Sequence, residues 1–187
     1  MTRYSWKVLF GGAGGVGKTT FLHRFMHDEF LPDTQMTVGV QFNTTEMNKG
    51  EHEIGLSLWD LGGQERFRFI QEIYMEGAHA AAIFFDMSRI GTIGQVKNWV
   101  EMIREHAGEN LPIVLVGTKN DLVENMDRKR IEAIAKQTVN DLGLISFTIT
   151  SSKTGINVEE FMDYLVDILL LESRSRDNSI NRDFSRP

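Results

Sequence analysis

Residues 8–20 read Val-Leu-Phe-Gly-Gly-Ala-Gly-Gly-Val-Gly-Lys-Thr-Thr, and this stretch decides the fold. It consists of a short apolar run, a glycine-rich turn, and then a lysine followed by two hydroxyl side chains. The pattern G-x-x-x-x-G-K-[ST] of a phosphate-binding loop is met by Gly12, Gly17, Lys18 and Thr19. We therefore predict a strand that ends at this loop and a helix that begins after it, with a polyphosphate at the helix N-terminus.

Each residue type in this loop has a chemical reason. Glycines allow positive φ angles and let backbone N–H groups approach a phosphate without interference from a Cβ atom. We expect Lys18 to reach the β- and γ-phosphates and the Thr19 hydroxyl to bind Mg²⁺. The loop residues expected to contact the ligand are Gly14, Gly15, Val16, Gly17, Lys18, Thr19 and Thr20.

Two other interpretations of the glycines stay open from this stretch alone. Gly12, Gly14 and Gly17 also spell G-x-G-x-x-G, the dinucleotide-binding fingerprint. That fingerprint requires an acidic residue about 20 positions further on, at the end of a second strand. The acids at positions 28 and 29 fall near the end of the expected helix instead, and the Lys-Thr pair would have no role. The second alternative is a glycine-rich turn that binds no ligand.

Composition narrows the class of protein. The 187 residues are 41% hydrophobic and 25% charged, which is typical of one soluble domain with a substantial core. The net charge of −6 argues against binding to nucleic acid or to anionic membranes. The chain has no Cys, so it has no disulfide or thiolate metal site, and the apolar stretch 78–85 is too short to span a bilayer. We predict a cytoplasmic protein.

Strand-like and helix-like segments alternate along the chain. The expected strands are 4–11, 39–47, 53–60, 80–86, 113–117 and 144–150, with a hairpin turn at 48–50. The expected helices are 18–27, 95–105, 128–141 and 158–171. In the third of these, the inward positions are Ile131, Ile134, Ala135 and Thr138. We predict an α/β domain over residues 1–171, with a six-stranded, mostly parallel sheet, one antiparallel edge strand and helices on both faces. Residues 172–187 are predicted to form a disordered polar tail.

Ligands of such sheets bind beyond the carboxyl ends of the strands, where the loops of this chain carry unusual residues. After the third strand, Asp60 is placed to bind Mg²⁺ through water. Gly63 can offer its N–H to a terminal phosphate, and Gln64 can orient an attacking water. A flexible Gly-Gly turn after an incidental acid is the plainer alternative.

The loops after the last two strands point to guanine. The Asp121 carboxylate can accept hydrogen bonds from the N1–H and N2–H₂ edge of guanine, a pair that adenine does not supply. The stem of Lys119 can lie along the base. In the last loop, a backbone N–H can donate to guanine O6, and the residues expected there are Ser151, Ser152 and Lys153.

The chain resembles a small GTPase of the Ras superfamily from about residue 4 to residue 171. The resemblance lies in the ordered motifs 12–19, 59–67, 118–121 and 151–153. The segments 37–42 (Thr-Val-Gly-Val-Gln-Phe), 59–60, 64–67 and 77–79 are most similar to the Rab group, and 59–64 is also similar to the Arf group. The resemblance implies the G-domain fold of P-loop NTPases, a GTP or GDP ligand, and Mg²⁺ as cofactor.

The resemblance also implies roles outside those motifs. Thr37 corresponds to a threonine whose hydroxyl binds Mg²⁺ and whose N–H contacts the γ-phosphate, and Phe30 to an aromatic residue that packs edge-on against guanine. Phe42, Trp59 and Tyr74 match an aromatic trio that Rab proteins present to effectors, although packing between a strand and a helix would equally account for them. GTPase-activating and exchange proteins are further expected partners.

The chain departs from the family pattern in several places. Thr118 stands where most members have an Asn that contacts guanine and braces the phosphate loop; the Rho group also has Thr there, so guanine binding is expected. Ser152 replaces the usual Ala, which leaves a backbone donor in place. Thr34 stands where many relatives have an aromatic residue over the phosphates, so we expect looser closure. Without Cys, this chain offers no site for the family's prenyl anchor.

These observations predict a switch that binds GTP or GDP with Mg²⁺ and hydrolyses GTP slowly. Residues 33–37 contain no Arg to act as a built-in arginine finger. We therefore expect a rate on the order of 10⁻⁴ to 10⁻³ s⁻¹, as in Ras, which a partner's Arg would raise by roughly 10³ to 10⁵. The alternatives are a guanine-nucleotide-binding module that does not cycle and a small P-loop kinase, for which we find no Arg-rich lid. His23 and His27 lack the Glu of a zinc motif and fit a helix surface.

Overall fold

A computed structural model describes residues 2–32, 35–64 and 67–183 of the chain. Its strands are β1 (Thr2–Gly12), β2 (Val40–Lys49), β3 (His52–Leu61), β4 (Ala80–Asp86), β5 (Ile113–Thr118) and β6 (Ser146–Ile149). Its α-helices are α1 (Lys18–His27), α2 (Arg68–Ile73), α3 (Val96–Ala107), α4 (Asn125–Leu142) and α5 (Val158–Asp183). Short 3-10 helices cover Ile90–Gln95 and Asn120–Leu122.

The strands form one six-stranded sheet in the order β2-β3-β1-β4-β5-β6. The edge strand β2 runs antiparallel to β3, and the other neighbouring pairs are parallel. The predicted α/β fold with a mostly parallel sheet and one antiparallel edge is confirmed. Because the strands of the parallel part share one direction, the loops that follow β1, β3, β4, β5 and β6 meet at the same edge of the sheet.

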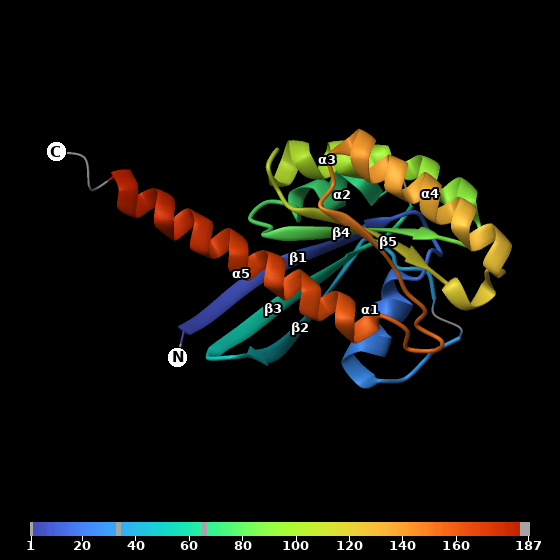
Figure 1. Cartoon of the computed structure of the whole chain (residues 1–187), viewed down its shortest axis with the longest axis horizontal. Coiled ribbons are helices and arrows are strands. Elements are labelled where there is room, and N and C mark those ends of the chain that lie inside the picture. Colours follow the sequence, from blue (N-terminus) through green and yellow to red (C-terminus); the bar gives the residue numbers. More distant parts are fainter. Residues whose placement is uncertain (1, 33–34, 65–66, 184–187) are drawn as a thin grey trace.

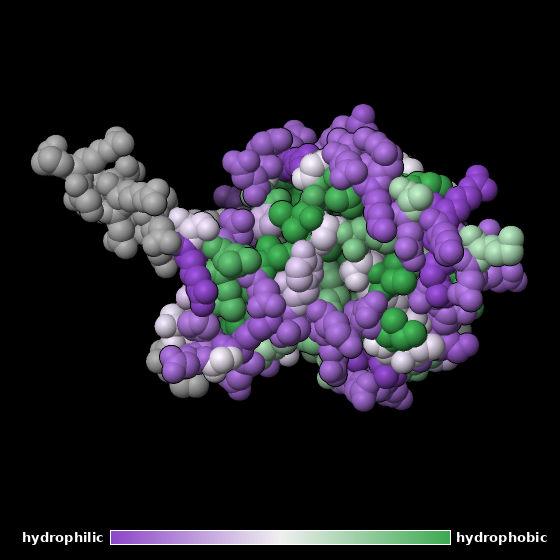
Figure 2. Space-filling model, in the orientation of Figure 1, coloured by the Kyte–Doolittle hydropathy of each residue, from purple (hydrophilic) through white to green (hydrophobic). Residues whose placement is uncertain are grey.

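Helices cover both faces of the sheet (Figure 1), and strand residues alternate between two cores. Val8 and Phe10 of β1 pack in the core beneath α1 and α5, whereas Leu9 between them packs in the core beneath α3 and α4. The sheet is therefore apolar on both sides. Figure 2 shows one face of the molecule, with polar residues over most of it and apolar residues in separate patches among them.

Trp99 on α3 packs directly against the backbone of β1. A Cβ atom at Gly11 would lie 2.7 Å from Cε3 of the indole and 3.0 Å from Cδ1 of Ile83. Gly11 therefore makes room for the indole, which is only 6% exposed. A side chain at this position would displace α3 from the strand that leads into the phosphate-binding loop.

Lys49 joins the β2–β3 hairpin to α5. Its ammonium lies 2.9 Å from a carboxylate oxygen of Asp163 and 2.8 Å from one of Asp167, and it donates to the Asp163 carbonyl at 3.0 Å. This contact fixes the edge of the sheet against the last helix.

In the described parts of the chain, none of the helices combines the length and apolar character needed to span a bilayer.

The structure differs from the sequence-based expectations in four elements. The short helix α2 was not expected, and β6 is shorter than the predicted strand 144–150. In α4, Ile134 was expected to face inward but is 37% exposed, because the inward stripe of this helix runs through Ile131, Ala135 and Val139. A disordered tail was expected from residue 172, whereas α5 continues to Asp183 and projects beyond the body of the domain (Figure 1). No Gly or Pro interrupts this segment to end the helix. Residues 184–187 lie outside the described chain.

Candidate nucleotide-binding site

The loop between β1 and α1 depends on glycine at its turning points. Gly12, Gly15 and Gly17 have φ angles of 135°, 71° and 100°, which favour glycine. A Cβ atom at Gly12 would also lie 2.3 Å from the carbonyl oxygen of Phe84 on β4. Gly17 is the N-cap of α1, so unpaired backbone N–H groups of the first helical turn lie beside the loop.

Lys18 folds back over this loop. Its side-chain ammonium donates to the carbonyls of Gly12 at 2.9 Å and Ala13 at 3.1 Å, and the residue is only 5% exposed. Burial lowers the pKa of Lys18 to about 8, while the nearby Asp60 carboxylate acts in the opposite direction. Lys18 is thus mostly charged at neutral pH, with its ammonium held at the centre of a concave loop.

A cavity lies over the loop, and we call it the phosphate cavity. It is lined by Gly14, Gly15, Gly17, Lys18, Thr19, Thr20, Gln35, Met36, Thr37 and Gly63. Gly63 closes one side, where a Cβ atom would lie 2.2 Å from the backbone nitrogen of Gly14. Most of the predicted phosphate contacts therefore meet at one place, whereas Val16 is fully buried and does not line this cavity.

Three oxygen-bearing side chains converge beside the phosphate cavity. The Thr19 hydroxyl lies 2.7 Å from the Thr37 hydroxyl and donates to the Asp60 carboxylate, to which Thr37 also donates at 3.2 Å. Asp60 is 1% exposed, and within the described residues its Oδ1 atom has no hydrogen-bond partner. Burial raises the pKa of Asp60, and the Lys18 charge and both threonine hydroxyls oppose this shift.

This cluster fits a hard divalent cation. Mg²⁺ prefers oxygen ligands and is commonly held in phosphate sites by few protein groups together with the phosphates. The unpaired Oδ1 of Asp60 is a buried acceptor that a cation or its water would satisfy. No group of three or more His, Cys, Asp or Glu side chains in the described chain forms an alternative metal site.

Gln64 lies at the end of the β3 loop. It is half-buried, and its amide nitrogen lies 4.0 Å from the Met36 sulfur rather than in the lining of the phosphate cavity. Met36 also lies 3.2 Å from where a Cβ atom of Gly14 would sit. No motif in the sequence marks Met36, because only the fold places it there. The predictions for Thr34 and for positions 65 and 66 lie outside the described residues.

A second cavity of about 430 Å³, which we call the base cavity, adjoins the first at Gly15, Gly17 and Thr20. Its remaining lining residues are Phe30, Pro32, Thr118, Lys119, Asp121, Leu122, Ser152 and Lys153. Ser151 is fully buried and instead donates from its hydroxyl to Oδ1 of Asp121 at 2.6 Å. Ser151 therefore orients the carboxylate that the sequence predicts to select the base.

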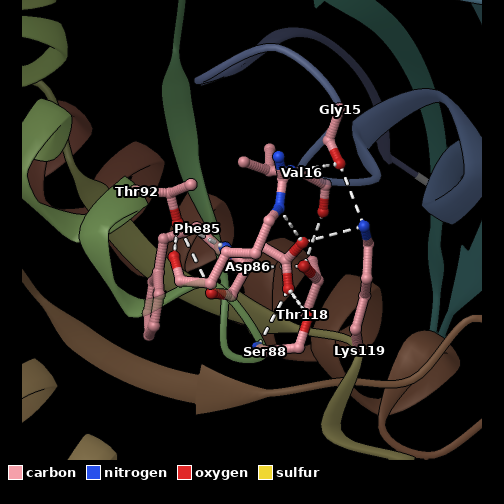
Figure 3. A network of polar contacts seen from close by, with 9 residues as sticks. Gly15, Val16, Phe85, Asp86, Ser88, Thr92, Thr118 and Lys119 are labelled. Carbon is pink, nitrogen blue, oxygen red and sulfur yellow. Dashed lines mark hydrogen bonds and ion pairs between the residues drawn. The ribbon is translucent and has the colours of Figure 1, made fainter. Parts of the chain in front are cut away.

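Thr118 braces the phosphate-binding loop. Its hydroxyl lies 2.5 Å from the carbonyl oxygen of Val16 and 3.0 Å from that of Phe85, so a single proton can serve one or both acceptors. Thr118 thus keeps a link to the phosphate-binding loop, although it stands where most members of the family have Asn. Figure 3 shows it beside a further network around Asp86 and Lys119 that the sequence analysis missed. Asp86 is the last residue of the apolar strand β4, and Asp60 is the last but one of β3, so an acid near the end of a strand was the signal that the sequence offered.

The aromatic trio is partly exposed, although its middle member, Trp59, packs against the core. The ring centroids of Phe42 and Trp59 lie 5.2 Å apart, and those of Trp59 and Tyr74 lie 5.3 Å apart. Phe42 is 55% and Tyr74 40% exposed, and the Lys7 ammonium lies 4.3 Å from the Trp59 ring centroid. The rings of Phe42 and Tyr74 therefore leave apolar area exposed on either side of Trp59.

Comparison with known proteins agrees with this geometry. The family model described as "Ras family" matches residues 7–170, which is most of the chain. The chain belongs to the Ras family. It is a Rab-like small GTPase. Membership of this family indicates, in general terms, that the chain binds guanine nucleotide, has GTPase activity, and has regulator and effector partners.

Relatives of this Rab-like GTPase come from distant organisms. Ras-related protein Rab-3 of Caenorhabditis elegans is 35% identical over 179 residues, covering 93% of this chain and 80% of the relative. GTP-binding protein ypt3 of Schizosaccharomyces pombe is 37% identical over 91% of this chain and 78% of its own length. Ras-related protein RABD2b of Arabidopsis thaliana is 39% identical over 84% of this chain and 76% of its own length.

Proposed function

We propose that this Rab-like GTPase is a Mg²⁺-dependent switch that hydrolyses GTP slowly and exposes an effector surface while GTP is bound. The observation that carries the proposal is the convergence of the Thr19, Thr37 and Asp60 oxygens beside the phosphate cavity. Thr37 comes from the loop before β2, so a ligand bound at this cluster would hold that loop against the phosphate cavity.

Nucleotide binding would divide between the two cavities. In the phosphate cavity, the Lys18 ammonium and the N–H groups around Gly15 and Gly17 would neutralise the phosphates. In the base cavity, the Asp121 carboxylate would accept the N1–H and N2–H₂ hydrogen bonds of guanine. The supporting contacts would come from Phe30, Thr118, Lys119, Ser152 and Lys153.

Thr19, Thr37 and Asp60 would hold Mg²⁺, directly or through water. The bound ion would supply positive charge to phosphate oxygens. The residues of this chain do the positioning: Asp60 orients the two hydroxyls, and its burial makes the carboxylate dependent on a positive partner. Gln64 would place the attacking water, and Gly63 would donate its N–H to the γ-phosphate.

The switch would follow from two loops that meet at the phosphate cavity. Gly63 lies against Gly14, and the Gly62 N–H donates to the Gly39 carbonyl at 2.8 Å, which joins the segment before β2 to the segment after β3. Loss of the γ-phosphate would remove the shared anchor of both segments. The rings of Phe42, Trp59 and Tyr74 would then change their presentation to effectors.

Replacing Gln64 with Leu is expected to slow hydrolysis of bound GTP about tenfold, because an apolar side chain cannot orient water. GTP affinity should change by less than about twofold, since Gln64 does not line the phosphate cavity. Single-turnover hydrolysis measures the first quantity and equilibrium titration the second. Gln137→Leu is the matched control, because Gln137 is exposed on α4 and contacts Asp141. An unchanged hydrolysis rate in Gln64→Leu would reject this role.

Identifying the nucleotide that remains bound to the purified protein is a direct test of the proposal. Acid release and chromatography should yield GDP, with GTP enriched after Gln64→Leu. A protein that retains guanine nucleotide but turns over no GTP with Mg²⁺ in a single-turnover assay would be a binding module that does not cycle. A protein that yields no guanine nucleotide and takes up none would contradict the proposal as a whole.

A further inference from the structure

The carboxylate of Asp86 is the centre of a polar network outside the predicted motifs. It ends β4 and is fully buried. One carboxylate oxygen accepts from the Ser88 backbone N–H at 2.9 Å and from its hydroxyl at 2.6 Å. The other accepts from Arg89 Nε at 2.8 Å and from the Lys119 ammonium at 2.8 Å. Burial by itself would raise the pKa of Asp86, but hydrogen bonds from Lys119, Ser88 and Arg89 outweigh it and lower the pKa, so Asp86 is ionised at neutral pH.

The same two cations also share a second acceptor. The carbonyl of Gly15 accepts from Arg89 Nη2 at 2.9 Å and from the Lys119 ammonium at 3.0 Å. Figure 3 shows Lys119 between the phosphate-binding loop and Asp86. Arg89 therefore reproduces both contacts of Lys119, although Arg89 lines neither cavity itself.

Gly15 is a sensitive place for such a contact. It lines both cavities, and its φ angle of 71° is one that residues with a Cβ atom rarely adopt. Because the peptide bond is planar and trans, fixing the Gly15 carbonyl makes the following N–H, that of Val16, point in the opposite direction within the same peptide plane. The two cations therefore set the direction of a donor in the phosphate-binding loop.

Arginine suits this position better than lysine would. Its rigid planar fork spans the Asp86 carboxylate with Nε and the Gly15 carbonyl with Nη2 at the same time. Asp86 and Lys119 would balance each other in charge, so Arg89 also adds one net positive charge beside the loop. Its side chain is 54% exposed, which means that solvent and salt screen this charge.

We propose that Arg89 is a positioning residue that slows the release of guanine nucleotide by holding the Gly15 carbonyl and Lys119 in place. The inference rests on the proposed function only in that guanine nucleotide binds at the two cavities. Removing the side chain takes away one of the two donors to the Gly15 carbonyl and leaves Lys119 to serve both acceptors alone.

The test is the dissociation rate of fluorescently labelled GDP from the Mg²⁺-bound protein. Arg89→Ala should release GDP about fivefold faster than the unaltered protein, the scale of a partly exposed charged contact. Arg89→Lys should fall between them, because an ammonium cannot span both acceptors with a rigid fork. Arg3→Ala is the matched control, since Arg3 is also an exposed arginine in an ion pair, with Glu46.

Two further readouts separate positioning from a general effect on folding. The difference between the unaltered protein and Arg89→Ala should shrink as salt concentration rises. Arg89→Ala and Lys119→Ala should be less than additive in the dissociation rate, because both act on the same two acceptors. Full additivity, or a release rate in Arg89→Ala equal to that of Arg3→Ala, would overturn the inference. If Arg89→Ala does not fold, a release rate in Arg89→Lys equal to that of the unaltered protein would overturn it. Failure of the unaltered protein to bind GDP would refute the proposed function instead.

Discussion

Asp121→Asn is expected to lower the affinity for GTP by about a hundredfold and to raise the affinity for xanthosine triphosphate. A carboxylate accepts two hydrogen bonds, whereas an amide offers one acceptor and one donor. The amide donor would face the N2–H₂ group of guanine, and the resulting mismatch leaves polar groups unpaired in the base cavity. Xanthine has a carbonyl at that position, so the same amide would match it. Competition titration against labelled GDP measures both affinities.

The expected change depends on how firmly Asp121 is held. Ser151 donates to its Oδ1 at 2.6 Å, so the replacement amide would keep its place. Asp141→Asn provides the control, because Asp141 lies on α4, where its carboxylate accepts from the exposed Gln137 amide at 2.7 Å. Equal GTP affinities for Asp121→Asn and Asp141→Asn would show that another group selects the base.

Lys18→Ala is expected to lower the affinity for GTP on the order of a hundredfold. The ammonium would form charge-assisted hydrogen bonds with the phosphates, and the low exposure of Lys18 makes each of them stronger than on a surface. The loss should grow with the number of phosphates, so it should be large for GTP and GDP and small for GMP. Isothermal calorimetry with the three nucleotides measures this dependence.

Lys97→Ala is the control for the loss of a lysine, because Lys97 is 68% exposed and lies 3.7 Å from Glu101 on the surface of α3. Circular dichroism should show that both variants keep the α/β fold. A loss in Lys18→Ala that is the same for GMP as for GTP would place the defect in folding rather than in phosphate binding.

Local patterns predicted the fold because each of them depends on near neighbours. The alternation of buried strands with amphipathic helices fixed the layers, and the turn at Gly50 fixed the one antiparallel pair. The site could be predicted because Lys18 and Asp121 follow strands of the parallel part of the sheet and Asp60 lies near the end of one, and those strands end at one edge. The family resemblance supplied Thr37 and Phe30, which no local pattern marked.

Contacts between distant segments could not be predicted from the sequence. In the sequence, nothing distinguishes Arg89 from other loop arginines. In the structure, β4 places it beside Gly15, which is 74 positions away. Gln71 is fully buried and donates to the Gly62 carbonyl, yet it lies in the helix α2 that periodicity did not reveal because six residues are too few. The length of α5 was missed for another reason: polar composition suggested disorder, although no residue in it breaks a helix.

The central claim is that this chain binds guanine nucleotide in preference to adenine nucleotide through one carboxylate and one phosphate-binding loop. Calorimetric titration of the nucleotide-stripped protein with GTP and with ATP, each with Mg²⁺, tests it most directly. We predict that GTP binds at least about a hundredfold more tightly than ATP. Comparable affinities for the two nucleotides, or no binding of either, would contradict the account.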